Sequence, residues 1–235
     1  QKICVKAETT LPAPDGDREQ LALMMVNGMT SVCLLEDFAE LKEGDWIVQN
    51  GANSSCGRYL IVLAKERGIK TCNIVRRENL FDELNALGAD ACVVDNGDAD
   101  ALAAAVKAAT GGVDIQLGFD LVAGEGTTRI ARCLAYGGKI VNYGFISGEP
   151  CSIPFHDLFF NNITLTGMST GRGLAKRDMT EITKIYEMLA EKISTGELKA
   201  AIAGTYTLDQ YAKAFAHAVK TGEDRKGKII LLPNG

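Results

Sequence analysis

The sequence contains few of the residues that build metal sites. It has two histidines, and its seven cysteines are spread along the chain without a C-x-x-C pair. A zinc site needs four nitrogen, sulfur or oxygen ligands, usually drawn from compact spacings, and no such cluster can be recognised. We therefore expect no metal ion, and we interpret the cysteines as buried thiols of a reducing compartment. The cysteines are Cys4, Cys33, Cys56, Cys72, Cys92, Cys133 and Cys151.

Long apolar runs and blocks of basic residues are also missing. No stretch reaches the roughly 18 apolar residues that read as a membrane span, and the first ten residues lack the positive and then apolar order of a signal peptide. The 25 basic and 30 acidic residues are scattered, with a net charge of −5, and no basic block could follow a phosphodiester backbone. We expect a cytoplasmic protein with neither a membrane nor a nucleic acid as partner.

What the sequence does have is a regular alternation of apolar runs and helical patterns between residues 45 and 168. Its 235 residues, 46% of them hydrophobic, can bury a large core. Crossovers of this length predict a six-stranded parallel sheet with helices on both faces, a doubly wound (Rossmann) α/β fold whose ligand binds at the carboxyl ends of the strands. The predicted strands are 46–50, 71–75, 91–95, 113–122, 139–145 and 162–168, and the predicted helices between them are 55–67, 80–87, 98–110 and 125–135.

The two ends of the chain fall outside this alternation. They contain strand-like segments that could pair into a small second sheet, the remnant of a mostly β domain. Residues 17–38 predict a helix that is broken near Asn27 and Gly28, and residues 176–198 predict an amphipathic packing helix. The strand-like segments are 3–7, 200–208 and 226–234.

The segment QNGANSSCG, residues 49–57, joins the first predicted strand to a helix but contains only two glycines. Aligned back from Gly57, the dinucleotide fingerprint G-x-G-x-x-G would place its first two glycines at Ala52 and Ser54. We expect small polar side chains to replace those glycines as donors to a pyrophosphate, aided by the positive end of the helix. A plain turn with an N-cap serine is the alternative. The predicted phosphate-binding residues are Asn53, Ser54, Ser55, Cys56 and Gly57.

Two arginines, Arg76 and Arg77, close the second predicted strand. In a dinucleotide fold this strand end lies beside the adenosine ribose. An acid there would favour a free 2′-hydroxyl, as an NADH site or a methyltransferase would need, whereas guanidinium groups favour a 2′-phosphate. The pair therefore predicts NADPH as cofactor. Two solvated arginines, one of them paired with Glu78, are the alternative.

Five segments together resemble the medium-chain dehydrogenase/reductase superfamily. They are QNGANSSCG (49–57), NIVRRE (73–78), GGKIVNYGFISGEP (137–150), NITLTGM (162–168) and KGKIILLP (226–233). The similarity is greatest to the zinc-free branch of NADPH-dependent 2-enoyl-thioester reductases and quinone oxidoreductases, and the asparagine-serine turn favours the enoyl reductases. The resemblance implies that residues 1–16 are a remnant of a GroES-like catalytic domain, that 17–199 hold connecting helices and the NADP(H)-binding domain, and that 200–235 return to the catalytic domain.

The resemblance also implies further cofactor-binding residues. Two lie near the nicotinamide end on the segment before the first strand, two line the ribose after the fourth strand, four flank the nicotinamide after the fifth strand, and a lysine approaches from the last strand. No residue of the chain is assigned as catalytic. The residues before the first strand are Asn27 and Thr30, and those after the fourth strand are Val122 and Ala123. Those after the fifth strand are Tyr143, Gly144, Phe145 and Ile146, and the lysine of the last strand is Lys228.

The activity that the resemblance implies is hydride transfer from NADPH to the C=C bond of a 2-enoyl thioester. A quinone or enone oxidoreductase and a non-catalytic NADPH-binding sensor remain alternatives. Residues 167–174 are small where such reductases carry tryptophans that shape the acyl pocket, which leaves the substrate open. The sixth strand is expected to join two copies edge to edge in a homodimer, because an open apolar strand edge invites a partner.

Overall fold

The computed structural model describes residues 4–7, 10–220 and 226–233, and the chain divides into two compact units. Residues 26–178 form the sheet unit, and residues 1–25 together with 179–235 form the terminal unit. The assignment of the two ends of the chain to a catalytic domain stays a prediction.

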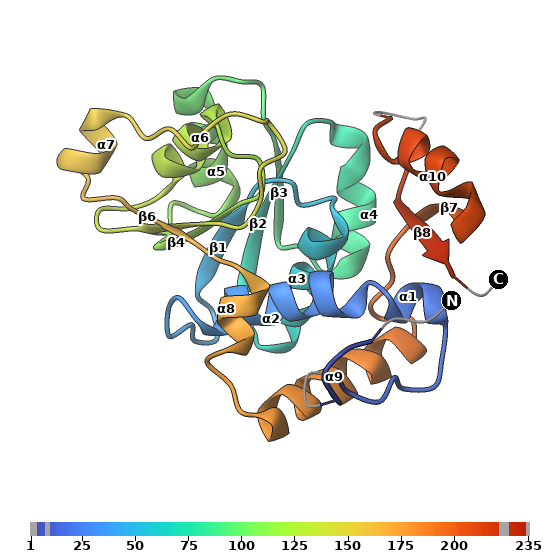
Figure 1. Ribbon diagram of the computed structural model, residues 1–235. Helices are drawn as coiled ribbons and strands as arrows, with labels where there is room; N and C mark the ends of the chain where they lie inside the picture. The colour runs from blue at the N-terminus through green and yellow to red at the C-terminus, as the bar shows by residue number, and fades with distance from the viewer. Residues whose placement is uncertain (1–3, 8–9, 221–225, 234–235) are drawn as a thin grey trace. The chain divides into compact units, whose positions relative to one another are not determined.

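Six strands form the sheet of the sheet unit, in the order β3-β2-β1-β4-β5-β6 (Figure 1). All neighbouring strands are parallel, which confirms the doubly wound fold. The strand order reverses between β1 and β4, and sheets of this kind bind their ligands outside the carboxyl ends of the strands at that point. The strands are β1 (Trp46–Gln49), β2 (Lys70–Val75), β3 (Ala91–Val94), β4 (Leu117–Asp120), β5 (Lys139–Asn142) and β6 (Thr164–Gly167).

Helices cover both faces of this sheet, because successive strand side chains point to opposite sides. Ile74 lies in a core cluster with Leu102 of α5, whereas its neighbour Val75 lies in a second cluster with Leu84 of α4. The helices α3 and α4 therefore cover one face, and α5 and α6 cover the other. Their bounds are α3 (Ser55–Glu66), α4 (Phe81–Leu87), α5 (Ala99–Ala109) and α6 (Glu125–Cys133); a 3-10 turn (Glu78–Leu80) precedes α4, and the short helices α7 (Phe155–Phe159) and α8 (Thr170–Leu174) flank β6.

Two strands end earlier than the apolar runs predicted. The run 113–122 contributes only β4, which ends at Asp120, and the run 139–145 contributes the shorter β5. The Asp120 side chain accepts hydrogen bonds from the backbone N–H groups of Val122 and Ala123, both at 3.0 Å, and turns the chain out of the sheet. The predicted ends of these strands are therefore wrong, and the residues beyond them form loops at the carboxyl edge of the sheet.

The segment 17–38 forms two helices with a π-helical turn between them. They are α1 (Arg18–Leu21) and α2 (Met29–Glu36), and the π-helical turn covers Met24–Gly28. The π-helical turn passes directly into α2, so the chain stays helical through Asn27 and Gly28, and the helix is interrupted at residues 22–23 instead. The predicted position of the break is therefore wrong. A π-helical turn of this kind is rare and is found frequently at functional sites.

The terminal unit contains a two-stranded parallel sheet of β7 (Ile202–Thr207) and β8 (Lys228–Leu232), as two of the strand-like segments predicted. The prediction of a third strand at 3–7 is wrong for the described residues 4–7, which form no strand. All four are exposed, so they bury no apolar face that would hold a strand in a sheet. The predicted amphipathic helix is α9 (Met179–Ser194), which buries Ile185 and Leu189. A 3-10 turn (Leu208–Gln210) and α10 (Tyr211–Ala218) separate the two strands.

Candidate functional site

The turn after β1 is held together by one left-handed residue and one helix cap. Gly51 has φ +60°, a conformation that favours glycine. Ser54 is the N-cap of α3, and its Oγ accepts a hydrogen bond from the N–H of Gly57 at 3.0 Å. A Cβ added to Gly57 would lie 2.6 Å from the carbonyl oxygen of Ala52. Gly57 therefore allows helix and turn to pack closely, as the third glycine of the fingerprint does.

The turn has the N-cap serine that the alternative interpretation predicted. A turn of this geometry can still hold a phosphate. A serine hydroxyl that accepts one hydrogen bond keeps its own proton for donation, so Ser54 can still donate to an anion. The amide N–H groups of Ser55 and Cys56 belong to the first turn of a twelve-residue helix, where backbone donors and the helix dipole attract negative charge. Asn53, beside them, is exposed.

A buried carboxylate joins the strand ends on either side of the point where the strand order reverses. Asp120, with no exposed surface, accepts hydrogen bonds from Asn50 Nδ2 at 2.7 Å, from Thr127 Oγ1 at 2.6 Å and from Asn142 Nδ2 at 3.1 Å. Asn50 in turn accepts from the N–H of Leu121 at 2.7 Å. The carboxylate thereby fixes the ends of β1, β4 and β5 relative to one another.

Asn50, Asp120 and Asn142 are not among the predicted site residues, although the sequence carries a signal for them. Each is a polar residue within or at the end of a predicted apolar run, and the three runs form neighbouring strands of the sheet. Polar residues at the carboxyl ends of parallel strands lie at the ligand-binding edge. This pattern could have identified all three.

The loops after β4 and β5 lie against each other. The N–H of Ser147 donates to the carbonyl of Val122 at 2.9 Å, and a Cβ on Gly144 would lie 2.4 Å from Leu121 Cδ1. Ala123 has φ +64°, a strained value for a residue with a side chain. The structure thus brings together the predicted residues of both loops. Phe145 and Ile146 are exposed there.

The Tyr143 hydroxyl is buried and has no hydrogen-bond partner among the described residues that satisfies normal geometry. Burial raises its pKa well above the usual 10, and the nearby Cys56 and Asp120 act in the same direction. Ser54 and Cys56 lie close enough to influence that pKa. A neutral, buried and unsatisfied hydroxyl beside the phosphate turn is a donor that a bound cofactor could use.

The predicted residues before β1 also reach this region. Ser31 Oγ donates to the carbonyl of Asn27 at 2.8 Å and to the carbonyl of Cys56 at 3.0 Å, which places the π-helical turn beside the start of α3. Thr30 Oγ1 lies 2.9 Å from Thr170 Oγ1, at the carboxyl end of β6. The segment around Asn27 and Thr30 therefore links the phosphate turn to the far strand of the sheet.

Arg76 and Arg77 follow β2, next to β1 in the sheet, and both are exposed. A third guanidinium, that of Arg58, forms an ion pair with Glu83 and donates to the carbonyl of Asn53 at 3.0 Å. Its hydrogen bond lowers the pKa of Glu83. Lys228 lies on β8 in the terminal unit, so its role stays a prediction.

Replacing Tyr143 by phenylalanine should separate a binding role from a packing role. Because the hydroxyl is buried without a partner, Tyr143→Phe should leave the free energy of unfolding within about 1 kcal/mol of wild type, measured by urea denaturation. If the cofactor uses the hydroxyl, NADPH affinity measured by titration calorimetry should fall about 3- to 10-fold.

Tyr59 offers a matched control for that variant. Its hydroxyl is also buried without a partner among the described residues, and burial raises its pKa to about 12. It lies on α3 within the core, so Tyr59→Phe should change stability as little as Tyr143→Phe and leave NADPH affinity unchanged. Equal affinities of both variants and the wild type would show that Tyr143 does not contact the cofactor.

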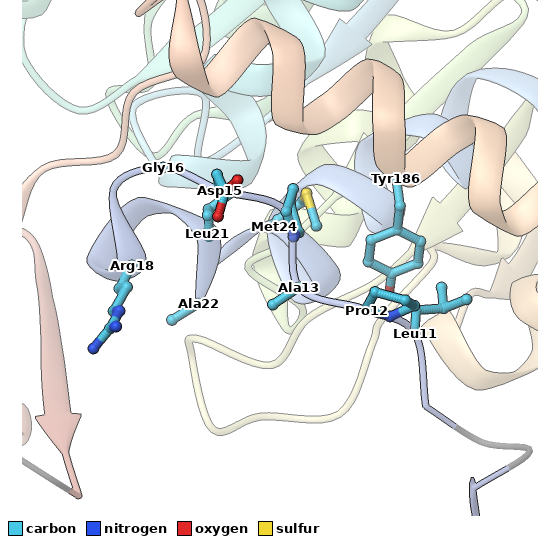
Figure 2. Close-up of a pocket in the computed structure, with 11 residues that line it drawn as sticks. Leu11, Pro12, Ala13, Asp15, Gly16, Arg18, Leu21, Ala22, Met24 and Tyr186 are labelled. Atoms are coloured by element: carbon cyan, nitrogen blue, oxygen red, sulfur yellow. The ribbon is translucent and has the colours of Figure 1, made fainter.

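A separate hollow of about 650 Å³ lies within the terminal unit (Figure 2). It is lined by residues 11–16, Arg18 and Leu21 of α1, Ala22, Met24 and Tyr186 of α9. None of the predicted cofactor-binding residues borders it, so it is not the candidate site. Across the described parts of the chain, no group of three or more His, Cys, Asp or Glu side chains could hold a metal ion. No helix in those parts is long and apolar enough to cross a membrane.

Comparisons with known proteins agree with this fold. The zinc-binding dehydrogenase family matches residues 56–188. A mitochondrial enoyl-(acyl-carrier-protein) reductase of Caenorhabditis elegans is 33% identical over 218 residues, which cover 91% of this chain and 61% of that protein. A solved mutant enoyl thioester reductase of Candida tropicalis is 25% identical, with a TM-score of 0.76, over 88% of this chain and 61% of its own.

A further solved structure, a mutant Etr1p in complex with NADP and crotonyl-CoA, has a TM-score of 0.76 at 24% identity. The alignment covers 88% of this chain and 60% of the Etr1p chain. At 24% identity the likeness supports the fold alone. The chain spans about 60% of the length of the curated relatives that it matches.

Proposed function

Because the chain belongs to the zinc-binding dehydrogenase family, within the medium-chain dehydrogenase/reductase superfamily, we propose that it is the NADPH-binding part of a 2-enoyl-thioester reductase. The observation that carries this proposal is the capped turn at the reversal of strand order. Its Gly57 lets α3 approach closely, and a pair of arginines follows the neighbouring strand. These residues fit a phosphorylated dinucleotide, because backbone N–H groups at a helix N-terminus suit a pyrophosphate and guanidinium groups suit a further phosphate.

Bound NADPH would supply the hydride that is delivered to the C=C bond. The residues of this chain would bind the cofactor and orient it. Ser54 and the first turn of α3 would hold the pyrophosphate, and Arg76 and Arg77 would hold the 2′-phosphate. The loops after β4 and β5 would flank the nicotinamide half, where exposed Phe145 and Ile146 would offer apolar surface that excludes water.

The name of the family refers to zinc, but the donor set of the described residues does not fit that ion. A catalytic zinc needs three protein ligands, and no group of three candidate side chains comes together within the described residues. We therefore propose no step through a metal. The general acid for the substrate carbon is likewise not assigned to a residue of this chain.

A 2-enoyl thioester is favoured over a quinone by the names of the curated relatives, which are enoyl reductases. The test is reduction of crotonyl-CoA by the full-length protein, followed as loss of NADPH absorbance. We expect NADPH-dependent turnover that exceeds turnover of a simple quinone. Turnover of the quinone alone would support the second candidate, a quinone oxidoreductase, and NADPH binding without turnover of either would support a sensor.

We also propose a homodimer through β6, which pairs with β5 alone among the described strands and has an exposed Leu165. Leu165→Lys should convert a dimer into a monomer of 25.1 kDa, because identical charges would meet across the symmetry axis and because lysine protects strand edges. Sedimentation equilibrium measures the change. Val113→Lys, at an exposed apolar residue away from β6, is the control; a monomeric wild type at micromolar concentration would refute the dimer.

The cytoplasmic location stays a prediction. The relatives are described as mitochondrial, which makes the mitochondrion the competing compartment. Both compartments are reducing, so the thiols do not decide between them. Microscopy of the tagged full-length protein would.

A further inference from the structure

Arg58, the residue after Gly57 on α3, connects the phosphate turn to α4. Its Nε donates a hydrogen bond to the carbonyl of Asn53 at 3.0 Å, and its Nη1 donates to the carboxylate of Glu83. Asn53 belongs to the turn after β1, whereas Glu83 lies in the first turn of α4. The guanidinium therefore lies between the phosphate turn and the helix that follows β2.

This is the region in which a dinucleotide fold places the adenosine ribose. The pyrophosphate lies at the amino end of the helix after the first strand, and the ribose 2′ position faces the end of the second strand. Arg76 and Arg77 follow β2, and only a 3-10 turn of three residues separates them from α4. We therefore expect Arg58 to meet a 2′-phosphate from the side of α3, and Arg76 and Arg77 from the side of β2.

The guanidinium of Arg58 has donors to spare. Arginine carries five N–H groups in a planar fork, and here one binds Asn53 and one binds Glu83. Within the described part of the chain, Nη2 has no hydrogen-bond partner, and it is not buried. The two Nη atoms together form the edge that binds phosphate oxygens in a bidentate manner. A phosphate at this edge would have to compete with Glu83.

Glu83 is held loosely, whereas Arg58 is held firmly. The Glu83 side chain is 51% exposed, and that of Arg58 is 17% exposed. Arg58 is the one partner of this carboxylate among the described residues, and its hydrogen bond lowers the pKa of Glu83, so the carboxylate is charged at neutral pH. An exposed carboxylate with a single ion pair can move into solvent at small cost. Arg58 would stay in place, because Asn53 still binds its Nε.

We propose that, without cofactor, Glu83 takes the place of the 2′-phosphate, and that Arg58 exchanges this carboxylate for the phosphate when NADPH binds. The inference rests on the proposed function, because it concerns the same cofactor. NADH carries a hydroxyl at the 2′ position, which cannot replace an anion. The exchange therefore adds to the selectivity that Arg76 and Arg77 provide. It also means that Glu83 weakens NADPH binding, because the phosphate must displace it.

Glu83→Gln tests the competition, because it removes the charge and keeps the size of the side chain. In the full-length protein, NADPH affinity measured by titration calorimetry should rise about 2- to 5-fold, and NADH affinity should not change. A role of Glu83 in stability alone would not tighten NADPH binding. Asp82→Asn is the matched control. Asp82 is exposed, carries the same charge on the neighbouring residue and has no partner among the described residues, so its loss should leave both affinities unchanged.

Arg58→Ala tests the guanidinium. NADPH affinity should fall about 5- to 20-fold, and NADH affinity should fall less, because NADH lacks the phosphate. Arg67→Ala is the control, since Arg67 caps the far end of α3 and forms an ion pair with Glu36 at 2.6 Å. It should leave both affinities unchanged.

The double variant Arg58→Ala with Glu83→Gln shows whether the two residues act together. Without the guanidinium there is nothing for which the carboxylate and the phosphate compete. In the Arg58→Ala background, Glu83→Gln should therefore no longer raise NADPH affinity. Urea denaturation of each variant confirms that the compared proteins are folded.

The outcomes separate the exchange from the proposed function. A wild type that binds neither NADPH nor NADH would refute the proposed function, and the exchange with it. A wild type that prefers NADPH would leave the proposed function standing, and the exchange would then be overturned by a Glu83→Gln variant without increased NADPH affinity or by an Arg58→Ala variant with unchanged affinity. A gain that Asp82→Asn reproduces, or that persists in the double variant, would indicate general charge repulsion and would also overturn the exchange.

Discussion

Gly57→Ala should abolish measurable NADPH binding and lower the free energy of unfolding by about 2–3 kcal/mol. The added Cβ would lie 2.6 Å from the carbonyl oxygen, 2.8 Å from Cα and 2.9 Å from the carbonyl carbon of Ala52. All three atoms belong to the backbone, so no side chain can move aside, and overpacking of this kind costs about 1–3 kcal/mol. The turn or the helix must shift, and Ser54 then no longer caps the first turn of α3.

The same substitution at Gly171 is the control. Gly171 lies in α8 with nothing within 4 Å of an added Cβ and no left-handed backbone, so Gly171→Ala should change stability by no more than about 1 kcal/mol. Urea denaturation and titration calorimetry with NADPH measure both variants. A Gly57→Ala protein that binds NADPH as the wild type does would show that the turn after β1 is not the phosphate site.

The double variant Arg76→Ala with Arg77→Ala should lose about 10- to 100-fold in NADPH affinity and nothing in NADH affinity. A hydrogen bond to a charged group contributes about 1.5–3 kcal/mol, reduced here because both side chains are exposed, and each 1.4 kcal/mol is a factor of ten. NADH lacks the 2′-phosphate, so it should bind both proteins equally. Titration calorimetry with each cofactor measures the four constants.

A control must remove the same charge elsewhere. Lys42→Ala with Lys107→Ala removes two exposed positive charges of the sheet unit that are not at the end of β2. It should leave both affinities unchanged, apart from a weak long-range effect that added salt screens. If the wild type binds NADPH and NADH equally, the arginines are solvated and the assignment of the cofactor fails.

The site could be predicted from the sequence only in part. The phosphate turn, the arginines and the two loops could be predicted because each directly follows a predicted strand. The carboxyl ends of parallel strands lie at one edge of the sheet, so segments that follow the strands come together there. The buried network around Asp120 was missed, because its partners Asn50, Thr127 and Asn142 come from separate segments. Only the register of parallel strands brings such residues together.

The sequence alone determined the doubly wound sheet, because apolar runs of strand length that alternate with helical segments can bury their side chains in few other ways. It also located the turn that we propose as the phosphate site. The tertiary structure decided where β4 and β5 end, since the Asp120 carboxylate captures backbone N–H groups beyond the strand. It also decided that α7 presents its phenylalanines outward, because burial of Asp157 depends on Arg132 and Asn161, and no pattern of spacing encodes which side of a five-residue helix finds a polar partner.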